Sequence, residues 1–185
     1  LLTMTEETGM DGAFGLQPNW LQAEILINTD SEEEGEIYMG CAGGIDFVTT
    51  LPLTREAVPA EFQTLKLTLK GLRGGHSGAD IHMGLGNANK LLARFLAAHA
   101  AELDLRLLAF SGGTLRNAIP REAFATVAVE SHKADALKSA AAHFLSAIKN
   151  EHGIKEPNIA LVTEPLAHQG NALNADSRDR FLNLL

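Results

Sequence analysis

The chain has 185 residues, of which 45% are hydrophobic and 21% charged, and its formal net charge is -8 at pH 7. This composition is ordinary for a globular protein with a core, and the acidic balance argues against nucleic-acid and anionic-membrane partners, which need a basic face. Because Cys41 is the single cysteine, we expect neither a disulfide within the chain nor a thiolate zinc cluster, and a reducing, cytoplasmic compartment is favoured.

The first part of the chain is predicted to form strands of an α/β sheet. Residues 1–4 have the pattern of a strand end, and 23–30 (AEILINTD) and 36–46 (EIYMGCAGGID) are apolar runs of strand length. Such runs are typical of strands buried on both faces. Without neighbouring strands we expect them to expose unpaired edges and apolar faces. Gly43 and Gly44 permit a sharp change of direction and predict a domain boundary.

From residue 62 onward the pattern is that of an α+β domain. FQTLKLTLKGL alternates apolar and polar residues, which predicts a half-buried antiparallel strand. MGLGNANKLLARFLAAHAAE has apolar residues at helical spacing. In chain order the expected elements are a strand (62–72), a helix (83–102), two strands (105–113 and 122–130), a helix (134–149) and a short strand (159–163). This order predicts an α+β sandwich of ferredoxin type.

Carboxylates at predicted strand ends are the first candidates for chemistry. Glu6 and Glu7 follow a short apolar run, so one can bind a metal while the other accepts a proton from water. Alternatively, Thr5 caps a helix that carries both glutamates in its first turn. Asp30 ends the run 23–30 and is either a cation ligand at the sheet edge or a turn residue.

Two further candidates lie in the α+β part. His76 is flanked by glycines in GGHSG, which let a ligand approach the imidazole closely, although a plain turn or an anion-binding nest has the same pattern. Asn117, in RNAIPR, offers an amide for a peptide carbonyl or carboxylate, or simply marks a turn between strands. The segment GLGNANK lacks the Gly-Lys-Ser/Thr ending of a phosphate-binding P-loop.

Taken together, four segments resemble one family. TMTEETGMDGAFGL, INTDSEEEGEIYMGCAGG, LKGLRGGHSGADIHMGLGNANKLLARFL and GGTLRNAIPREAFA are similar to the aminoacyl-histidine dipeptidases, which belong to the di-zinc metallopeptidases together with carboxypeptidase G2 and the carnosinases. The similarity extends from Leu1 to about Lys149 and continues more weakly to the end of the chain. It implies that residues 1–43 are part of a di-zinc catalytic domain and that 44–185 are a ferredoxin-like lid, truncated at its C-terminal end.

The resemblance also implies roles for individual residues. Glu6 corresponds to the family's general base, and Glu7 and Asp30 correspond to zinc ligands of the two metal sites. His76 corresponds to a lid histidine that stabilises the tetrahedral intermediate or binds substrate, and Asn117 to a lid asparagine that binds the C-terminal end of the substrate. The implied reaction is zinc-dependent hydrolysis of dipeptides, notably Xaa-His, in the cytoplasm, with a homodimer formed through the lid.

The sequence departs from the family pattern in its metal ligands. The upstream His-x-Asp motif, the bridging aspartate and a histidine near the C-terminus of the family have no counterpart here, whereas a catalytic zinc site normally has about three protein ligands. We therefore predict that this polypeptide alone neither hydrolyses dipeptides nor binds zinc tightly. The alternative is a non-catalytic binding or dimerisation module of ferredoxin type, in which the carboxylates of Glu7 and Asp30 need not converge.

Overall fold

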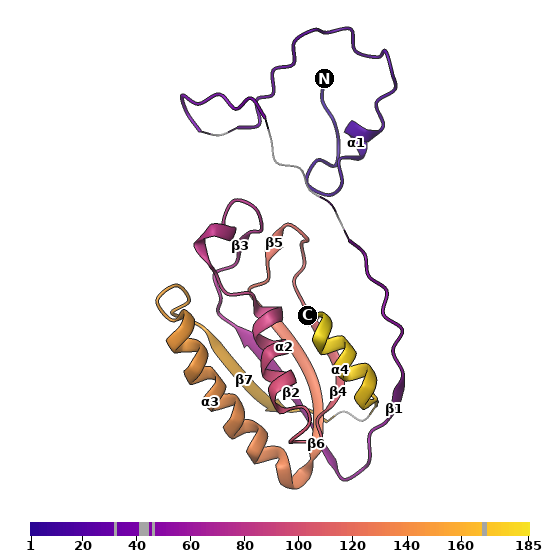
Figure 1. Cartoon of the computed structure of the whole chain (residues 1–185), viewed down its shortest axis with the longest axis vertical. Helices are drawn as coiled ribbons and strands as arrows, with labels where there is room; N and C mark the ends of the chain where they lie inside the picture. Colours follow the sequence, from indigo (N-terminus) through magenta and orange to yellow (C-terminus); the bar gives the residue numbers. More distant parts are fainter. Residues whose placement is uncertain (32, 41–44, 46, 168–169) are drawn as a thin grey trace. The chain divides into compact units, whose positions relative to one another are not determined.

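The computed structural model describes residues 1–31, 33–40, 45, 47–167 and 170–185. The chain divides into two compact units, Leu1–Val48 and Thr49–Leu185, which are described separately below (Figure 1). Cys41 and the predicted boundary at Gly43 and Gly44 lie outside the described residues.

The unit 49–185 is built on a four-stranded antiparallel sheet. Its strands are β2 (Phe62–Lys70), β4 (Arg106–Gly112), β6 (Ala123–Glu130) and β7 (Ala160–Pro165), in the spatial order β4-β6-β2-β7. Helices α2 (Ala88–His99), α3 (Ala134–His152) and α4 (Ala175–Leu184) cover one face of the sheet (Figure 1). The mixed α/β content and the order strand, helix, strand, strand, helix, strand agree with the sequence prediction for this part.

Alternation along β2 determines which face is buried. Leu65, Leu67 and Leu69 are all 0% exposed and pack in the core with the helices. Lys66 and Thr68 lie on the opposite face, where the Lys66 ammonium lies 5.1 Å from the centre of the Phe124 ring. One face of the sheet is therefore apolar and covered and the other is partly solvated, as is usual for antiparallel sheets.

Helix α2 begins later than predicted. The expected helix started at residue 83, whereas the structure has a 3-10 turn, η1 (Ile81–Met83), and then α2 from Ala88. Gly84 has a φ of 62°, a left-handed conformation that ends the 3-10 turn. The side chain of Asn87 accepts a hydrogen bond from the backbone N–H of Lys90 and caps α2.

Two short sheets complete the unit. Strand β1 (Arg55–Ala57) pairs with β8 (Asn171–Leu173), and β3 (Gly75–His76) pairs with β5 (Ala118–Ile119). The Arg55 guanidinium donates to the carbonyl of Leu108, at 2.8 Å, and to that of Asn171, at 2.9 Å, so β1 and β8 are tied to β4 where its pairing with β6 is irregular. At the other edge of the main sheet, β7 pairs only with β2 within the described residues.

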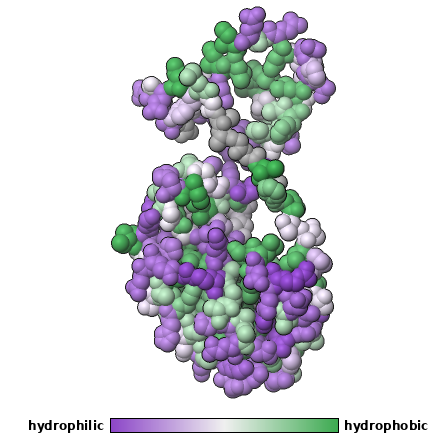
Figure 2. All heavy atoms as spheres, viewed as in Figure 1, coloured by the Kyte–Doolittle hydropathy of each residue, from purple (hydrophilic) through white to green (hydrophobic). Residues whose placement is uncertain are grey.

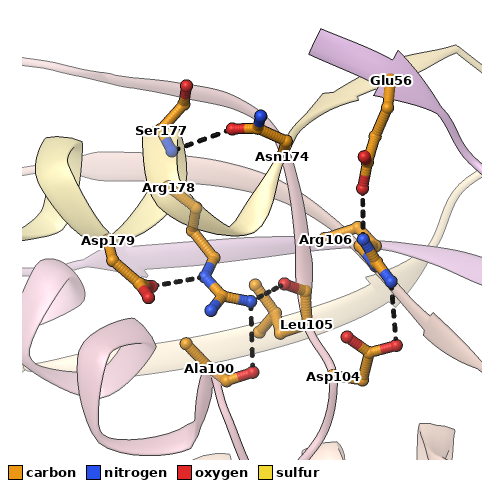
Figure 3. Close-up of polar contacts among 9 residues, drawn as sticks. All are labelled: Glu56, Ala100, Asp104, Leu105, Arg106, Asn174, Ser177, Arg178 and Asp179. Carbon is orange, nitrogen blue, oxygen red and sulfur yellow. Dashed lines mark hydrogen bonds and ion pairs between the residues drawn. The ribbon is translucent and has the colours of Figure 1, made fainter. Parts of the chain in front are cut away.

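Two arginines join separate elements of this unit (Figure 3). Arg178 of α4 is 6% exposed, and its Nη1 donates to the carbonyls of Leu105, at 2.8 Å, and Ala100, at 3.4 Å. Arg106 of β4 forms ion pairs with Glu56 of β1 and with Asp104, the latter at 3.0 Å. Cationic side chains thus satisfy carbonyls and carboxylates where helix α2 ends and β4 begins.

The unit 1–48 differs from the prediction. Its described residues contain one short helix, α1 (Asp11–Phe14), and no strand, so the strands expected over 1–4, 23–30 and 36–46 are wrong for the described residues. Strands buried on both faces need paired neighbours, and an apolar run without a partner strand gains no ladder hydrogen bonds. None of its described residues is buried, and apolar residues gather on its surface (Figure 2). Leu2 and Met39, for example, are 98% and 99% exposed, which agrees with the expected exposure of apolar faces.

No helix in the described part of the chain combines the length and the apolar character that crossing a bilayer requires.

Candidate functional site

His76 lies at the end of β3 in a tight glycine-rich turn. Gly74 precedes it with a φ of 67°, a left-handed conformation that a larger residue adopts only with strain. Gly78 lies under the ring, since a Cβ added there would be 3.3 Å from the Cε1 and Nδ1 atoms of His76. Glycines on both sides therefore allow the tight bend and close approach that the sequence predicts.

The hydrogen bonds of His76 leave one ring nitrogen available. Its Nδ1 accepts from the backbone N–H groups of Gly78 and Ala79, each at 3.0 Å. Because Nδ1 is an acceptor, the proton of the neutral ring lies on Nε2, which is then a hydrogen-bond donor. The His76 side chain is exposed, so this donor is open to a ligand.

Asp80 holds the turn from the inside and was missed by the sequence analysis. Its Oδ2 accepts from the backbone N–H of His76 at 2.7 Å. A carboxylate four residues after the histidine, in GGHSGAD, is the signal that points to it, because aspartate side chains commonly bond nearby backbone N–H groups in turns.

The structure brings Asn117 next to this turn. The backbone N–H of Ser77 donates to the carbonyl of Asn117 at 2.8 Å, and His76 lies opposite Ala118 in the β3–β5 pair. His76 and Asn117 line a common cavity of about 760 Å³, together with the cationic residues Arg73 and Arg121. A cavity of this size accommodates a small ligand, and its lining includes an amide, an imidazole, two cations and the acidic residue Glu122.

The predicted carboxylates all belong to the other unit. Glu6 and Glu7 are exposed in a turn that precedes α1. Thr5, with a φ of 59°, exchanges hydrogen bonds of 3.0 Å with Asp11: the Thr5 hydroxyl accepts from the Asp11 backbone N–H and donates to its carboxylate. Thr5 thus bonds the first residue of the helix, but the glutamates lie before the helix rather than in its first turn.

Asp30 is exposed as well, and its backbone N–H donates to the side chain of Asn28 at 2.9 Å, as in a turn. Within the described residues no group of three or more His, Cys, Asp or Glu side chains is arranged to hold a metal ion. Glu7 and Asp30 have the right chemistry for zinc, but two carboxylates are fewer ligands than a catalytic zinc site uses. The described residues therefore do not by themselves fit a zinc site.

Comparison with known proteins shows which proteins this chain is similar to. Residues 67–156 match the peptidase dimerisation domain. Over its full 185 residues, the chain is 70% identical to the cytosol non-specific dipeptidase of Escherichia coli (strain K12), and the match covers 38% of that protein. The structure also matches the crystal structure of the aminoacylhistidine dipeptidase from Vibrio alginolyticus, with a sequence identity of 52% and a TM-score of 0.80. This match covers 98% of this chain and 37% of that one.

The resemblance to the aminoacyl-histidine dipeptidases is therefore confirmed over the whole chain. The chain spans well under half the length of both relatives, 38% of one and 37% of the other.

Proposed function

We propose that this chain is part of a cytoplasmic, metal-dependent dipeptidase, in which residues 49–185 bind the dipeptide and join two subunits. The observation that supports it best is the shared cavity of His76 and Asn117 in a chain that is 70% identical to a protein named as a dipeptidase. The fold is proposed to be ferredoxin-like, because the order β4-β6-β2-β7 results from a strand, helix, strand, strand, helix, strand sequence.

In this proposal the cavity holds the two ends of a short peptide. His76 donates a hydrogen bond from Nε2 to the carbonyl oxygen that gains negative charge during hydrolysis. The Asn117 amide binds the C-terminal end of the substrate. Arg73 and Arg121 also line the cavity together with one acidic residue, Glu122, and this excess of positive charge favours the substrate carboxylate. A dipeptide with C-terminal histidine fits a cavity of about 760 Å³.

The residues of 1–48 are proposed to complete a metal site together with parts of the enzyme that the relatives contain and this chain does not. Glu7 and Asp30 would be zinc ligands, and Glu6 would accept a proton and later return it to the leaving amine. Zinc, when bound, supplies Lewis acidity to such a site. The exposed apolar side chains of 1–48 would pack against the remainder of the same catalytic domain.

Binding is tested by NMR titration of the 185-residue chain with a dipeptide that has a C-terminal histidine. We expect chemical-shift changes at His76 and Asn117, and their loss in His76→Ala and Asn117→Ala. His99→Ala and Asn158→Ala, which change the same residue types outside the cavity, should bind as the wild type does. Absence of any change at millimolar dipeptide would refute the substrate proposal.

Hydrolysis is tested separately on the same chain with added zinc. We expect no release of histidine, because too few ligands are present. Turnover by the purified chain would contradict the proposed division of the metal site.

The partner proposed for β7 is a second copy of the chain, since residues 67–156 match a dimerisation domain and β7 has a free edge within the described residues. Analytical ultracentrifugation should give a dimer. Val162→Lys places a charge on the edge strand and should shift the protein to monomer, whereas Thr126→Lys, on the central strand β6, should not. A wild-type monomer at all concentrations would rule this out. If the chain dimerises but binds no dipeptide, the alternative of a non-catalytic dimerisation module is favoured.

A further inference from the structure

A buried carboxylate lies just after helix α3, outside the cavity described above. Glu156 is 0% exposed, and both of its oxygens accept hydrogen bonds from backbone N–H groups. Oε2 accepts from Arg73 at 2.7 Å, and Oε1 accepts from Gly86 at 2.9 Å. These two donors are 83 and 70 residues away in the sequence, so the contact joins distant parts of the chain.

The two donors are the ends of the segment that carries His76. Residues 73–86 leave the sheet after β2, form the His76 turn and the 3-10 turn η1, and return to the start of α2. Lys155, the neighbour of Glu156, adds a third contact, from its ammonium to the carbonyl of Met83. The turn that follows α3 is therefore bound to both ends of this segment and to η1.

The fit at Gly86 is close. A Cβ added there would be 2.8 Å from the Cδ2 atom of Leu72 and 3.5 Å from the Oε1 atom of Glu156. Inside the segment, Asp80 bonds the His76 N–H, and Ser77 bonds Asn117 of the neighbouring strand region. These contacts hold the His76 turn itself, and the two anchored ends hold the segment on either side of it.

Burying a carboxylate is unfavourable unless hydrogen bonds compensate for lost water. Glu156 has this compensation from two charge-assisted bonds, which are stronger than bonds between neutral groups. A glutamine would keep one acceptor oxygen but would turn its NH₂ group toward a peptide N–H, where two donors would face each other. Both anchors thus require a carboxylate.

We infer that Glu156 is a positioning residue for His76. The Glu156 carboxylate ties the two ends of the segment 73–86 to the turn after α3 and thereby holds the imidazole beside Asn117. The importance of this placement for catalysis rests on the function proposed above for His76, whereas the anchoring itself does not depend on it.

The test compares three ¹⁵N-labelled versions of the 185-residue chain by NMR: wild type, Glu156→Gln and Glu151→Gln. Glu151 is the matched control, an exposed glutamate near the end of α3 that pairs with Arg94. Amide hydrogen exchange reports how tightly the segment 73–86 is held, and the ring nitrogen signals of His76 report its tautomer. If Glu156 contributed only to overall stability, the His76 tautomer would not change in Glu156→Gln as long as the sheet remained folded.

In wild type, the amides of Arg73 and Gly86 should be protected, and His76 should show the single Nε2–H form. In Glu156→Gln, amides of the segment 73–86 should exchange roughly 10- to 100-fold faster, and both neutral forms of His76 should be present, while the amides of β2 and β6 keep their protection. Glu151→Gln should behave as wild type.

Three results would overturn the inference. The first is that the exchange of the segment and the His76 signals do not change in Glu156→Gln. The second is that this variant loses protection throughout the sheet. The third is that the Arg73 and Gly86 amides are unprotected in wild type, a result that requires no variant. If instead the segment loosens as expected but no dipeptide binds, the proposed function fails and the anchoring stands.

Discussion

Replacing Arg178 by methionine should lower the free energy of unfolding of the unit 49–185 by about 2–4 kcal/mol. The side chain is 7% exposed, and methionine would fill much of its volume while removing the guanidinium donor from the Leu105 carbonyl. The Ala100 carbonyl would keep its hydrogen bond from the Leu105 backbone N–H, at 3.0 Å. The 2.8 Å bond to Leu105 contributes about 1.5–3 kcal/mol as a bond to a charged group. The pair with Asp179, whose side chain is 56% exposed, adds at most about 1 kcal/mol.

Arg180 of the same helix is the matched control. Its side chain is 47% exposed and lies 3.7 Å from the carboxylate of Asp176, so Arg180→Met should cost no more than about 0.5 kcal/mol. Urea denaturation followed by circular dichroism gives both free energies of unfolding. If the m-values of the two variants equal that of the wild type, a difference in midpoint reflects a difference in stability. Equal midpoints for the two variants would refute the assignment of Arg178 as the buried link between α4, α2 and β4.

Three further substitutions follow from the same unit and use the same assay. Asn87→Ala removes the cap that accepts from Lys90 at 3.2 Å and should cost about 1 kcal/mol; an unchanged midpoint would contradict the cap. Gly71→Ala forces a side chain into a φ of 82° with a Cβ 2.0 Å from the Asn158 carbonyl, so a loss of about 2 kcal/mol or more is expected. Leu67→Ala opens a cavity at a 0% exposed position and should cost about 2–5 kcal/mol; a loss below about 1 kcal/mol would place Leu67 outside the core.

The sheet of the unit 49–185 could be predicted because its signals are local. The alternation in FQTLKLTLK requires two different faces, and β2 has them, with Leu67 buried and Lys66 on the other side. The start of α2 could not be read from apolar spacing alone, because Leu85 continues the helical pattern although Gly84 has already ended the turn before it. Backbone conformation at a glycine, rather than hydrophobic spacing, determines that boundary.

The unit 1–48 shows the opposite case. AEILINTD has the composition of a buried strand, but a strand forms only when another strand completes its hydrogen bonds, and composition does not supply that partner. The residues of AEILINTD have a high strand propensity, but they do not form a strand in this chain.

The candidate site was predictable residue by residue but not as an arrangement. The glycines around His76 and the amide of Asn117 each marked a position, and the pairing of β3 with β5 brings the two together. Glu156 gave no signal, since HGIKEPN looks like an ordinary polar turn and its partners lie 70 and 83 residues away. A role that depends on distant contacts is not visible in a local pattern.

The guanidinium of Arg55 on the Leu108 carbonyl has a consequence for assembly. It fills an acceptor on the outer side of β4, so a foreign strand that approached there would have to displace a charged group before it could form a ladder. In the dimer proposed above, association by strand addition would therefore be directional: two β7 strands would pair, and the remaining outer sides would discourage a third chain. Growth of this kind would stop at a closed pair and would not continue into a filament.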